Sequence, residues 1–197
     1  MKAELKKSAT EKGGWVQDFD QTSLDYYSDL CPEGAVHART GLCLGLCVLW
    51  LHTLKNAKAF SAGDASSATG RAIVTSLVNR TQAEPGKWQQ VLKSEAATMS
   101  LKESFQEARY NDTNIDGLVT PEFMYFAIIV VHTGAGSHAV AARVTAGWCA
   151  FFDPNEGEVI FSGEGCVGRL KTWFGEYLAA VLRHDYQGGS YIVFGYQ

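Results

Sequence analysis

The sequence predicts an α+β fold, with helices in the first half of the chain and an antiparallel sheet in the second. Apolar residues recur at helical spacing up to about Tyr110, whereas short apolar segments alternate with turn sequences after Thr120-Pro121. This order of helices first and sheet second is typical of α+β domains. With 197 residues, 46% of them apolar, the chain is long enough to bury a full hydrophobic core.

Residues 1–14 are polar and rich in lysine, and they end in Gly13-Gly14. We therefore predict a flexible leader over 1–14 and a single domain over 15–197. No apolar segment follows the first lysines, so a cleaved secretory signal is not expected. The longest apolar runs have about ten residues, half of what a membrane span needs. The net charge is −4 and the 17 basic residues are scattered, which argues against a nucleic-acid partner.

The segment Cys43–Ala57 is predicted to be a buried helix, because it is apolar on every side. Thr40 and Gly41 suit its N-cap region. Cys43 then lies in the first turn, where the helix dipole and the unpaired amides favour a thiolate and can hold an oxyanion. A small buried apolar residue is the other interpretation of Cys43. Cys47, one turn further along, is expected only to pack.

The remaining elements follow from periodicity and turn signals. From Ala65 to about Tyr110, "ASSATGRAIVTSLVNR" and "PGKWQQVLKSEAATMSLKESFQEARY" have helical patterns, separated by "TQAEPG". Four strands, "EFMYFAIIVVH", "SHAVAARVT", "WCAFFD" and "GEVIFSG", are predicted to form an antiparallel meander. An amphipathic helix over Val167–Tyr186 and a last strand in "GGSYIVFGYQ" complete the domain.

Metal-binding interpretations of two segments are weak. Cys43 and Cys47 have the C-x3-C spacing of a metal clip, but a structural zinc ion needs about two more Cys or His ligands and the sequence has no second pair. The segment Asp112–Phe123, "DTNIDGLVTPEF", begins like a calcium loop but has Phe123 where the bidentate Glu belongs. We expect an ordinary turn there and leave a weak calcium site open. No cofactor is expected, and five cysteines without paired spacing favour reduced thiols.

A nucleophilic cysteine needs a base. The five histidines are His37, His52, His132, His138 and His184. His138 is the best candidate, because it opens a predicted strand after the turn "TGAGS" and could project into a cleft between sheet and helix; His132 is the second candidate. The third member of such a site orients the imidazole. Asp153, at the end of the neighbouring strand in "FFDPNEG", fits this role, although Asp before Pro-Asn is also ordinary turn chemistry.

The motifs "TGLCLGLCVLWL", "SHAVAA" and "FFDPNEG" together resemble those of the YopT/AvrPphB family of bacterial effector cysteine proteases. Their order and spacing agree with that family. The resemblance implies a papain-like fold, with Cys43 as the nucleophile, His138 as general base and acid, and Asp153 as the orienter of His138. It also implies a thiol-dependent endopeptidase that leaves the bacterium through a specialised secretion system and acts in the target-cell cytoplasm. The expected partners are a protein substrate in the host or target cell and a secretion chaperone or cognate inhibitor.

Two other functions fit the same residues. A Cys-His-Asp site also supports glutamine deamidation or transglutamination, and a catalytically silent binding module could keep the fold. One departure from the resembled pattern concerns the oxyanion. Papain-like enzymes use a Gln or Asn side chain a few residues before the nucleophile, but the candidates here are His37, Ala38 and Arg39. The sequence therefore assigns no oxyanion donor.

Overall fold

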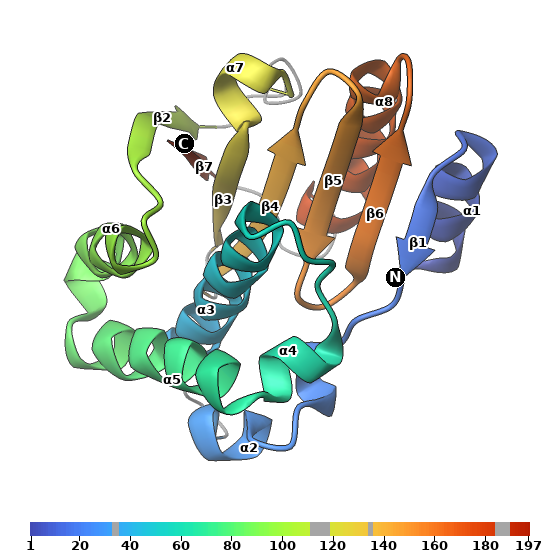
Figure 1. Ribbon diagram of the computed structural model, residues 1–197. Helices are drawn as coiled ribbons and strands as arrows, with labels where there is room; N and C mark the ends of the chain where they lie inside the picture. The colour runs from blue at the N-terminus through green and yellow to red at the C-terminus, as the bar shows by residue number, and fades with distance from the viewer. Residues whose placement is uncertain (33–35, 111–118, 134–135, 184–189) are drawn as a thin grey trace.

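A computed structural model describes residues 1–32, 36–110, 119–133, 136–183 and 190–197. Its centre is an antiparallel sheet in the order β1-β6-β5-β4-β3-β7-β2 (Figure 1). The strands are β1 (Trp15–Gln17), β2 (Glu103–Tyr110), β3 (Phe126–Thr133), β4 (Gly136–Val144), β5 (Trp148–Asp153), β6 (Gly157–Ser162) and β7 (Ser190–Tyr196). The predicted meander is β3 to β6, and the last strand, β7, inserts between β3 and β2.

Helices cover both faces of the sheet, with α3, α5 and α6 on one side and α1 and α8 on the other (Figure 1). The helices are α1 (Ala3–Glu11), α2 (Tyr27–Leu30), α3 (Val36–Lys55), α4 (Ala62–Ser66), α5 (Ala68–Ala83), α6 (Trp88–Thr98), α7 (Pro121–Met124) and α8 (Cys166–Tyr177), with 3₁₀ turns η1 (Gln21–Ser23) and η2 (Pro85–Lys87) and a π-helical segment η4 (Leu178–Arg183). Alternate residues of β4 supply the two cores: Ala139 and Ala141 face α3, whereas Val140 and Ala142 face α8. The predicted α+β class is confirmed.

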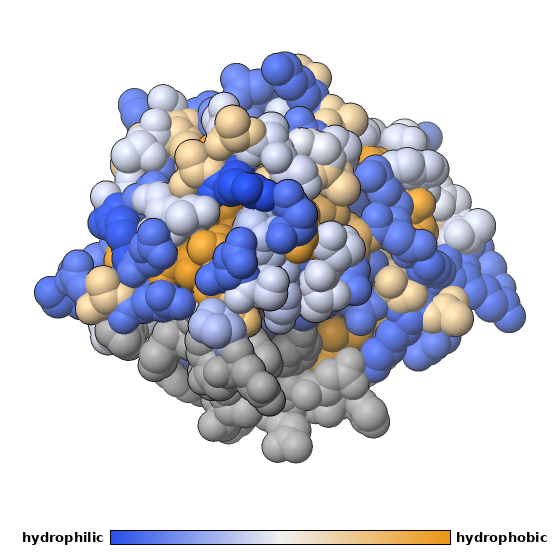
Figure 2. All heavy atoms as spheres, turned by 90° about the horizontal axis from the view of Figure 1, so that it is seen from below, coloured by the Kyte–Doolittle hydropathy of each residue, from blue (hydrophilic) through white to orange (hydrophobic). Residues whose placement is uncertain are grey.

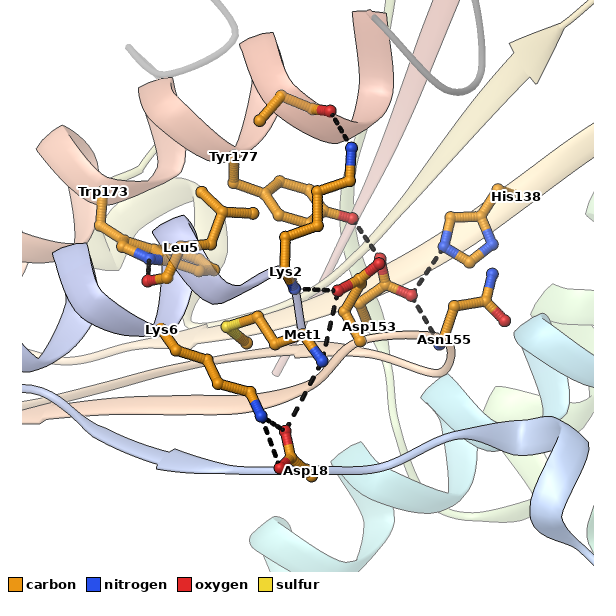
Figure 3. Close-up of polar contacts among 12 residues, drawn as sticks. Met1, Lys2, Leu5, Lys6, Asp18, His138, Asp153, Asn155, Trp173 and Tyr177 are labelled. Atoms are coloured by element: carbon orange, nitrogen blue, oxygen red, sulfur yellow. Dashed lines mark hydrogen bonds and ion pairs between the residues drawn. The ribbon is translucent and has the colours of Figure 1, made fainter.

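The structure corrects the prediction of a flexible leader over residues 1–14. Helix α1 packs on α8, and its Leu5 and Ala9 are buried. The indole N–H of Trp173 donates to the carbonyl of Leu5 over 3.0 Å, and the backbone N–H of Lys2 donates to Glu156 over 2.7 Å (Figure 3). Two apolar residues four positions apart are enough to bury one side of a short helix. Because most residues around Leu5 and Ala9 are polar or charged, the sequence shows no clear amphipathic pattern here.

The predicted helix up to Tyr110 is also wrong in its last part. Helix α6 ends at Thr98, and Ser100 has a positive φ of 59°, which directs the chain out of the helix. The next residues form β2, which pairs with β7 at the edge of the sheet. Strand β2 is at the edge of the sheet, where charged residues are common. Its sequence, ESFQEARY, therefore lacks the alternation of apolar and polar residues by which a strand is predicted.

A third correction concerns the start of α3. The helix begins at Val36, before the predicted cap at Thr40 and Gly41. Cys43 is therefore the eighth residue of α3 and lies in its third turn, not in its first. The amides of that part of the helix are used by intrahelical hydrogen bonds, so the helix N-terminus is not what favours a thiolate at this position.

Two glycines let α3 approach α5 closely. A Cβ atom on Gly41 would lie 2.8 Å from the Cα of Val78, and one on Gly45 would lie 2.9 Å from the Cα of Val74. Being one turn apart, both glycines face α5. Cys43, two residues from each, points about 200° away around the helix axis. The glycines of "TGLCLGLC" thus seat α3 against α5 and leave the thiol on the other side.

We expect Gly45→Ala to destabilise the fold by about 1–3 kcal/mol, because the added methyl group meets backbone that cannot move aside easily. The matched control is Gly168→Ala in α8, where a Cβ would meet nothing within 4 Å. This control is expected to be neutral or to stabilise by up to about 1 kcal/mol, because alanine favours helix. Urea unfolding measures both. Equal effects of the two substitutions would contradict the close approach of α3 and α5.

Candidate active site

The structure brings together His138 and Asp153 at one end of the sheet. His138 lies near the start of β4 and Asp153 ends β5, and because these strands are antiparallel neighbours the two residues lie at the same end of the sheet. The Nε2 atom of His138 is 2.9 Å from Oδ1 of Asp153 (Figure 3). The two side chains are almost fully buried, with 2% and 0% of their surface exposed. They form a hydrogen-bonded pair shielded from water.

Further hydrogen bonds hold the carboxylate of Asp153 from two other directions. The hydroxyl of Tyr177, in the last turn of α8, donates to Oδ2, and the backbone N–H of Asn155 donates to Oδ1 over 2.8 Å. Figure 3 shows both groups pointing at the carboxylate. The Asp-Pro-Asn turn, which the sequence alone explains as an ordinary turn, therefore also holds the carboxylate of Asp153 in place. Each oxygen of the buried carboxylate has a partner, which a buried charge requires.

These contacts shift both pKa values in directions that keep the pair charged. Burial raises the pKa of Asp153, but the charge of His138 and the hydrogen bonds from His138, Tyr177 and Asn155 outweigh it and hold this pKa below its usual value. Burial lowers the pKa of His138, but the charges of Asp153 and Cys43 and the hydrogen bonds with both raise it to about 10. At neutral pH the pair is therefore an imidazolium and a carboxylate.

Cys43 completes a chain of three contacting residues. Because Nε2 of His138 faces Asp153, Nδ1 is the ring nitrogen left for the side-chain hydrogen bond with Cys43. Cys43 itself is buried on α3, with 3% of its surface exposed. A neighbouring imidazolium favours the charged form of a thiol. In the structure Cys43 therefore contacts the imidazole of His138 and does not lie at the helix N-terminus that the sequence suggested.

Gln21 is a residue of this site that the sequence reasoning missed. It is buried in η1, and its Oε1 atom is 3.4 Å from Sγ of Cys43. Its amide nitrogen donates to Oδ1 of Asn155, and its backbone N–H donates to the carbonyl of Pro154 over 2.8 Å. The amide lies 22 positions before Cys43, far from the few residues directly upstream where such an amide is expected in a papain-like enzyme. The side chains of His37, Ala38 and Arg39 lie outside the described residues.

The other candidates take different places. His132 has its Nδ1 atom 2.9 Å from Oγ of Ser137 and packs edge-on against Trp88, and burial lowers its pKa. His52 contacts Asn56 late in α3. His184 lies outside the described residues.

Cys47 is buried on α3, and its pKa is raised well above the usual value by burial and by the charges of Cys43 and Asp153. It therefore stays a thiol and packs. Among the described residues, no three His, Cys, Asp or Glu side chains converge as metal ligands. Most of the calcium-like segment Asp112–Phe123 lies outside the described residues.

The pKa shifts of the pair set two pH limits on its contribution to stability. For His138, raised from 6.5 to about 10, the contribution is complete below pH 6.5 and is lost as the pH rises through about 10. For Asp153, lowered from 3.8, the contribution is present above pH 3.8 and is lost as the pH falls through the lowered value.

We expect NMR titration of the His138 imidazole to give a pKa well above 8 in the wild type. In Asp153→Asn, the carboxylate charge is lost while an acceptor for Nε2 remains, so this pKa is expected to fall, because burial lowers it and only the contact with Cys43 still raises it. Asp18→Asn is the matched control, since Asp18 is exposed and pairs with Lys6. A wild-type value near 6.5 would contradict the charged pair.

Seen from below (Figure 2), the end of the molecule where β4 begins presents mainly hydrophilic side chains, with hydrophobic ones showing between them. Among the helices of the described residues, none combines the length and the apolar character that a bilayer span requires. No protein-family model matches the sequence, and no curated protein matches it either.

Several solved structures are similar to this chain. The avirulence protein AvrPphB of Pseudomonas has 14% sequence identity and a TM-score of 0.57, over 86% of this chain and 98% of its own. PatoxP, a cysteine protease-like domain of the Photorhabdus asymbiotica toxin PaTox, has 14% identity and a TM-score of 0.44, over 98% of this chain and 57% of its own. The YopT domain of the Pasteurella multocida PfhB2 toxin has 16% identity and a TM-score of 0.35, over 92% of this chain and 90% of its own.

At this identity the likeness to AvrPphB concerns the fold alone. It extends over nearly the whole of both chains, so it is a likeness of the complete domain and not of one motif. It agrees with the fold that the three sequence motifs led us to expect. The predicted papain-like α+β fold is confirmed, and the chain has the fold of AvrPphB.

Proposed function

We propose that this protein is a thiol-dependent endopeptidase that acts through Cys43, His138 and Asp153. The observation that carries the proposal is the buried, charged His138–Asp153 pair in hydrogen-bond contact with Cys43. A structural role alone would favour apolar residues at such a place, because burying two charges costs several kcal/mol per ion before their attraction is counted. Strongly shifted pKa values beside a cysteine are typical of activated thiol sites.

The geometry supports the following reaction. In the proposed reaction Nδ1 of His138 holds the proton taken from Cys43, and the thiolate Sγ attacks the carbonyl carbon of a peptide bond and forms a tetrahedral intermediate. The intermediate collapses when Nδ1 gives its proton to the leaving amine, and an acyl-enzyme remains. Water then attacks the thioester, His138 takes up its proton, and the acid product leaves as the thiolate is restored. Asp153 keeps Nε2 occupied throughout.

Gln21 is our candidate for the oxyanion donor. Its carboxamide lies next to Sγ of Cys43, where the oxygen of a tetrahedral intermediate would form. The amide oxygen faces the sulfur when Cys43 carries a proton, and a 180° rotation of the amide turns its N–H groups there instead. A thiolate or an oxyanion favours this second orientation, because both need a donor. The carboxamide of Asn155 can rotate in the same way, so it can pair with Gln21 in either orientation of the Gln21 amide.

The substrate class and the place of action are proposed on the likeness to AvrPphB, a protein named for avirulence. We propose that the chain acts as a virulence effector or toxin on a protein of the host or target cell, which it reaches through a specialised secretion system. A secretion chaperone or a cognate inhibitor stays a prediction.

The first test replaces the nucleophile. Cys43→Ala is expected to abolish the appearance of new N-termini in a target-cell lysate, measured by proteomic mass spectrometry, because no other described thiol contacts His138. Cys47→Ala, one turn away and fully buried, is the matched control and is expected to keep cleavage.

The alternatives are separate outcomes of this experiment. Glutamine residues converted to glutamate, without new N-termini, would identify a deamidase, and cross-linked glutamines would identify a transglutaminase. A wild-type protein that changes no protein in the lysate but retains one would be a binding module. Full cleavage by Cys43→Ala would overturn the assignment of the nucleophile.

A second test separates the oxyanion role of Gln21 from a structural one. Gln21→Ala is expected to lower kcat by roughly 10²–10³-fold with little change in KM, the usual loss when one oxyanion donor is removed. Alkylation of Cys43 by iodoacetamide, which forms no oxyanion, is expected to lose far less of its rate, because Gln21 then contributes only its contact with the sulfur. Gln90→Ala, at an exposed position of α6, serves as the control. An equal loss in both reactions would assign Gln21 to holding the site together instead.

A further inference from the structure

Two buried cysteines outside the active site lie in direct contact. Cys149 is the second residue of β5 and Cys166 is the first residue of α8. Their sulfur atoms are 3.1 Å apart, and both side chains are fully buried. Cys149 also contacts the carbonyl of Thr145 over 3.3 Å, and Cys166 contacts the carbonyls of Thr145 and Ala146 over 3.5 Å. The two thiols thus share one small polar pocket.

This pair is separate from the proposed catalytic residues. Four strand residues place Cys149 about 13 Å from Asp153, and eleven helix residues place Cys166 about 16 Å from Tyr177. The two turns that carry the cysteines are joined by a hydrogen bond from the N–H of Gly163 to the carbonyl of Gly147, over 2.9 Å. The proximity of the thiols therefore rests on backbone contacts of the fold and not on the orientation of two side chains alone.

We propose that Cys149 and Cys166 form an intramolecular disulfide when the protein meets a low-molecular-weight disulfide such as oxidised glutathione. A disulfide bond is about 2.05 Å long, so the sulfurs must approach by about 1 Å. The exposed turn before Cys166 supplies this freedom, since Gly163 and Gly165 both have positive φ and a Cβ atom on Gly163 would meet nothing within 4 Å.

The exchange balances as two thiol–disulfide steps. The thiolate of Cys166 attacks one sulfur of oxidised glutathione, which releases one glutathione thiolate and leaves a mixed disulfide. Cys149 loses its proton and attacks the Cys166 sulfur of this mixed disulfide, which releases the second glutathione. Two protein thiols are oxidised and one glutathione disulfide is reduced. Burial and the hydrogen bond and charge of Cys166 raise the pKa of Cys149 to about 12, which disfavours the thiolate of Cys149 in the folded protein.

The bond would close a loop of chain whose ends are 17 positions apart. This loop contains the end of β5, the turn with Asp153 and Asn155, and all of β6. A cross-link of this span restricts the unfolded chain and leaves the folded one nearly unchanged. The oxidised protein is therefore expected to be the more stable form.

The test refolds the full-length protein from urea in a buffer of reduced and oxidised glutathione, so that burial does not limit access to the thiols. Free thiols are then alkylated, and the cysteines are mapped by peptide mass spectrometry. We expect one cross-linked peptide pair that contains Cys149 and Cys166, with the other three cysteines alkylated. Separate glutathione adducts on Cys149 and Cys166, two free thiols there, or a bond to any other cysteine would overturn the proposal.

A second readout compares melting temperatures of the oxidised and the reduced protein. Oxidation is expected to raise the Tm of the wild type by roughly 5–10 °C. Cys166→Ser should lose this difference, whereas Cys31→Ser, which removes another buried cysteine, should keep it. If Cys166→Ser does not fold, Cys149→Ala takes its place, and the peptide map of the wild type decides in either case. Since neither readout requires proteolysis, the result is independent of the proposed function.

Discussion

A pair of opposite charges with almost no access to water is the constraint on which this structure depends. Removing a carboxylate and an imidazolium from water costs several kcal/mol for each ion, and their attraction offsets this only if every remaining polar atom has a partner. Asp153 meets this condition through Tyr177 and Asn155, and His138 meets it through Cys43. One ion pair therefore fixes the relative positions of β4, β5, α8 and α3, which come from distant parts of the sequence.

The packing of α3 serves the same pair from the opposite side. A helix with apolar residues all round has no preferred orientation from hydrophobic burial alone. The orientation of α3 is set by Gly41 and Gly45, because only residues without a side chain leave room for the backbone of α5 at this distance. The rotation that satisfies the glycines is the one that directs Cys43 toward the sheet and not toward α5. Small residues on one side of a helix thereby place a reactive residue on the other.

The sequence predicted the three residues whose neighbours form recognisable motifs, Cys43, His138 and Asp153, and the structure brings all three together. It could not predict Gln21 or Tyr177, because each acts across more than twenty positions of sequence. Gln21 stands in a segment without a pattern of its own, and the helical pattern around Tyr177 does not name the residue that its hydroxyl contacts. The strands β3 to β6 were predictable, since their alternation and turns are local. The ends of α3, the edge strand β2 and the docking of α1 depend on tertiary contacts, which local patterns do not record.

The docking of α1 has a consequence for the surroundings of Asp153. Helix α1 packs on α8, α8 carries the hydroxyl that holds the Asp153 carboxylate, and Lys2 bonds to Glu156 in the turn just beyond Asp153. Short terminal helices are the first parts of a fold to detach. Detachment of α1 therefore loosens the surroundings of the carboxylate while the sheet stays intact. The arrangement around Asp153 can therefore change under mild heat, or after clipping near the N-terminus, in a protein that still looks folded.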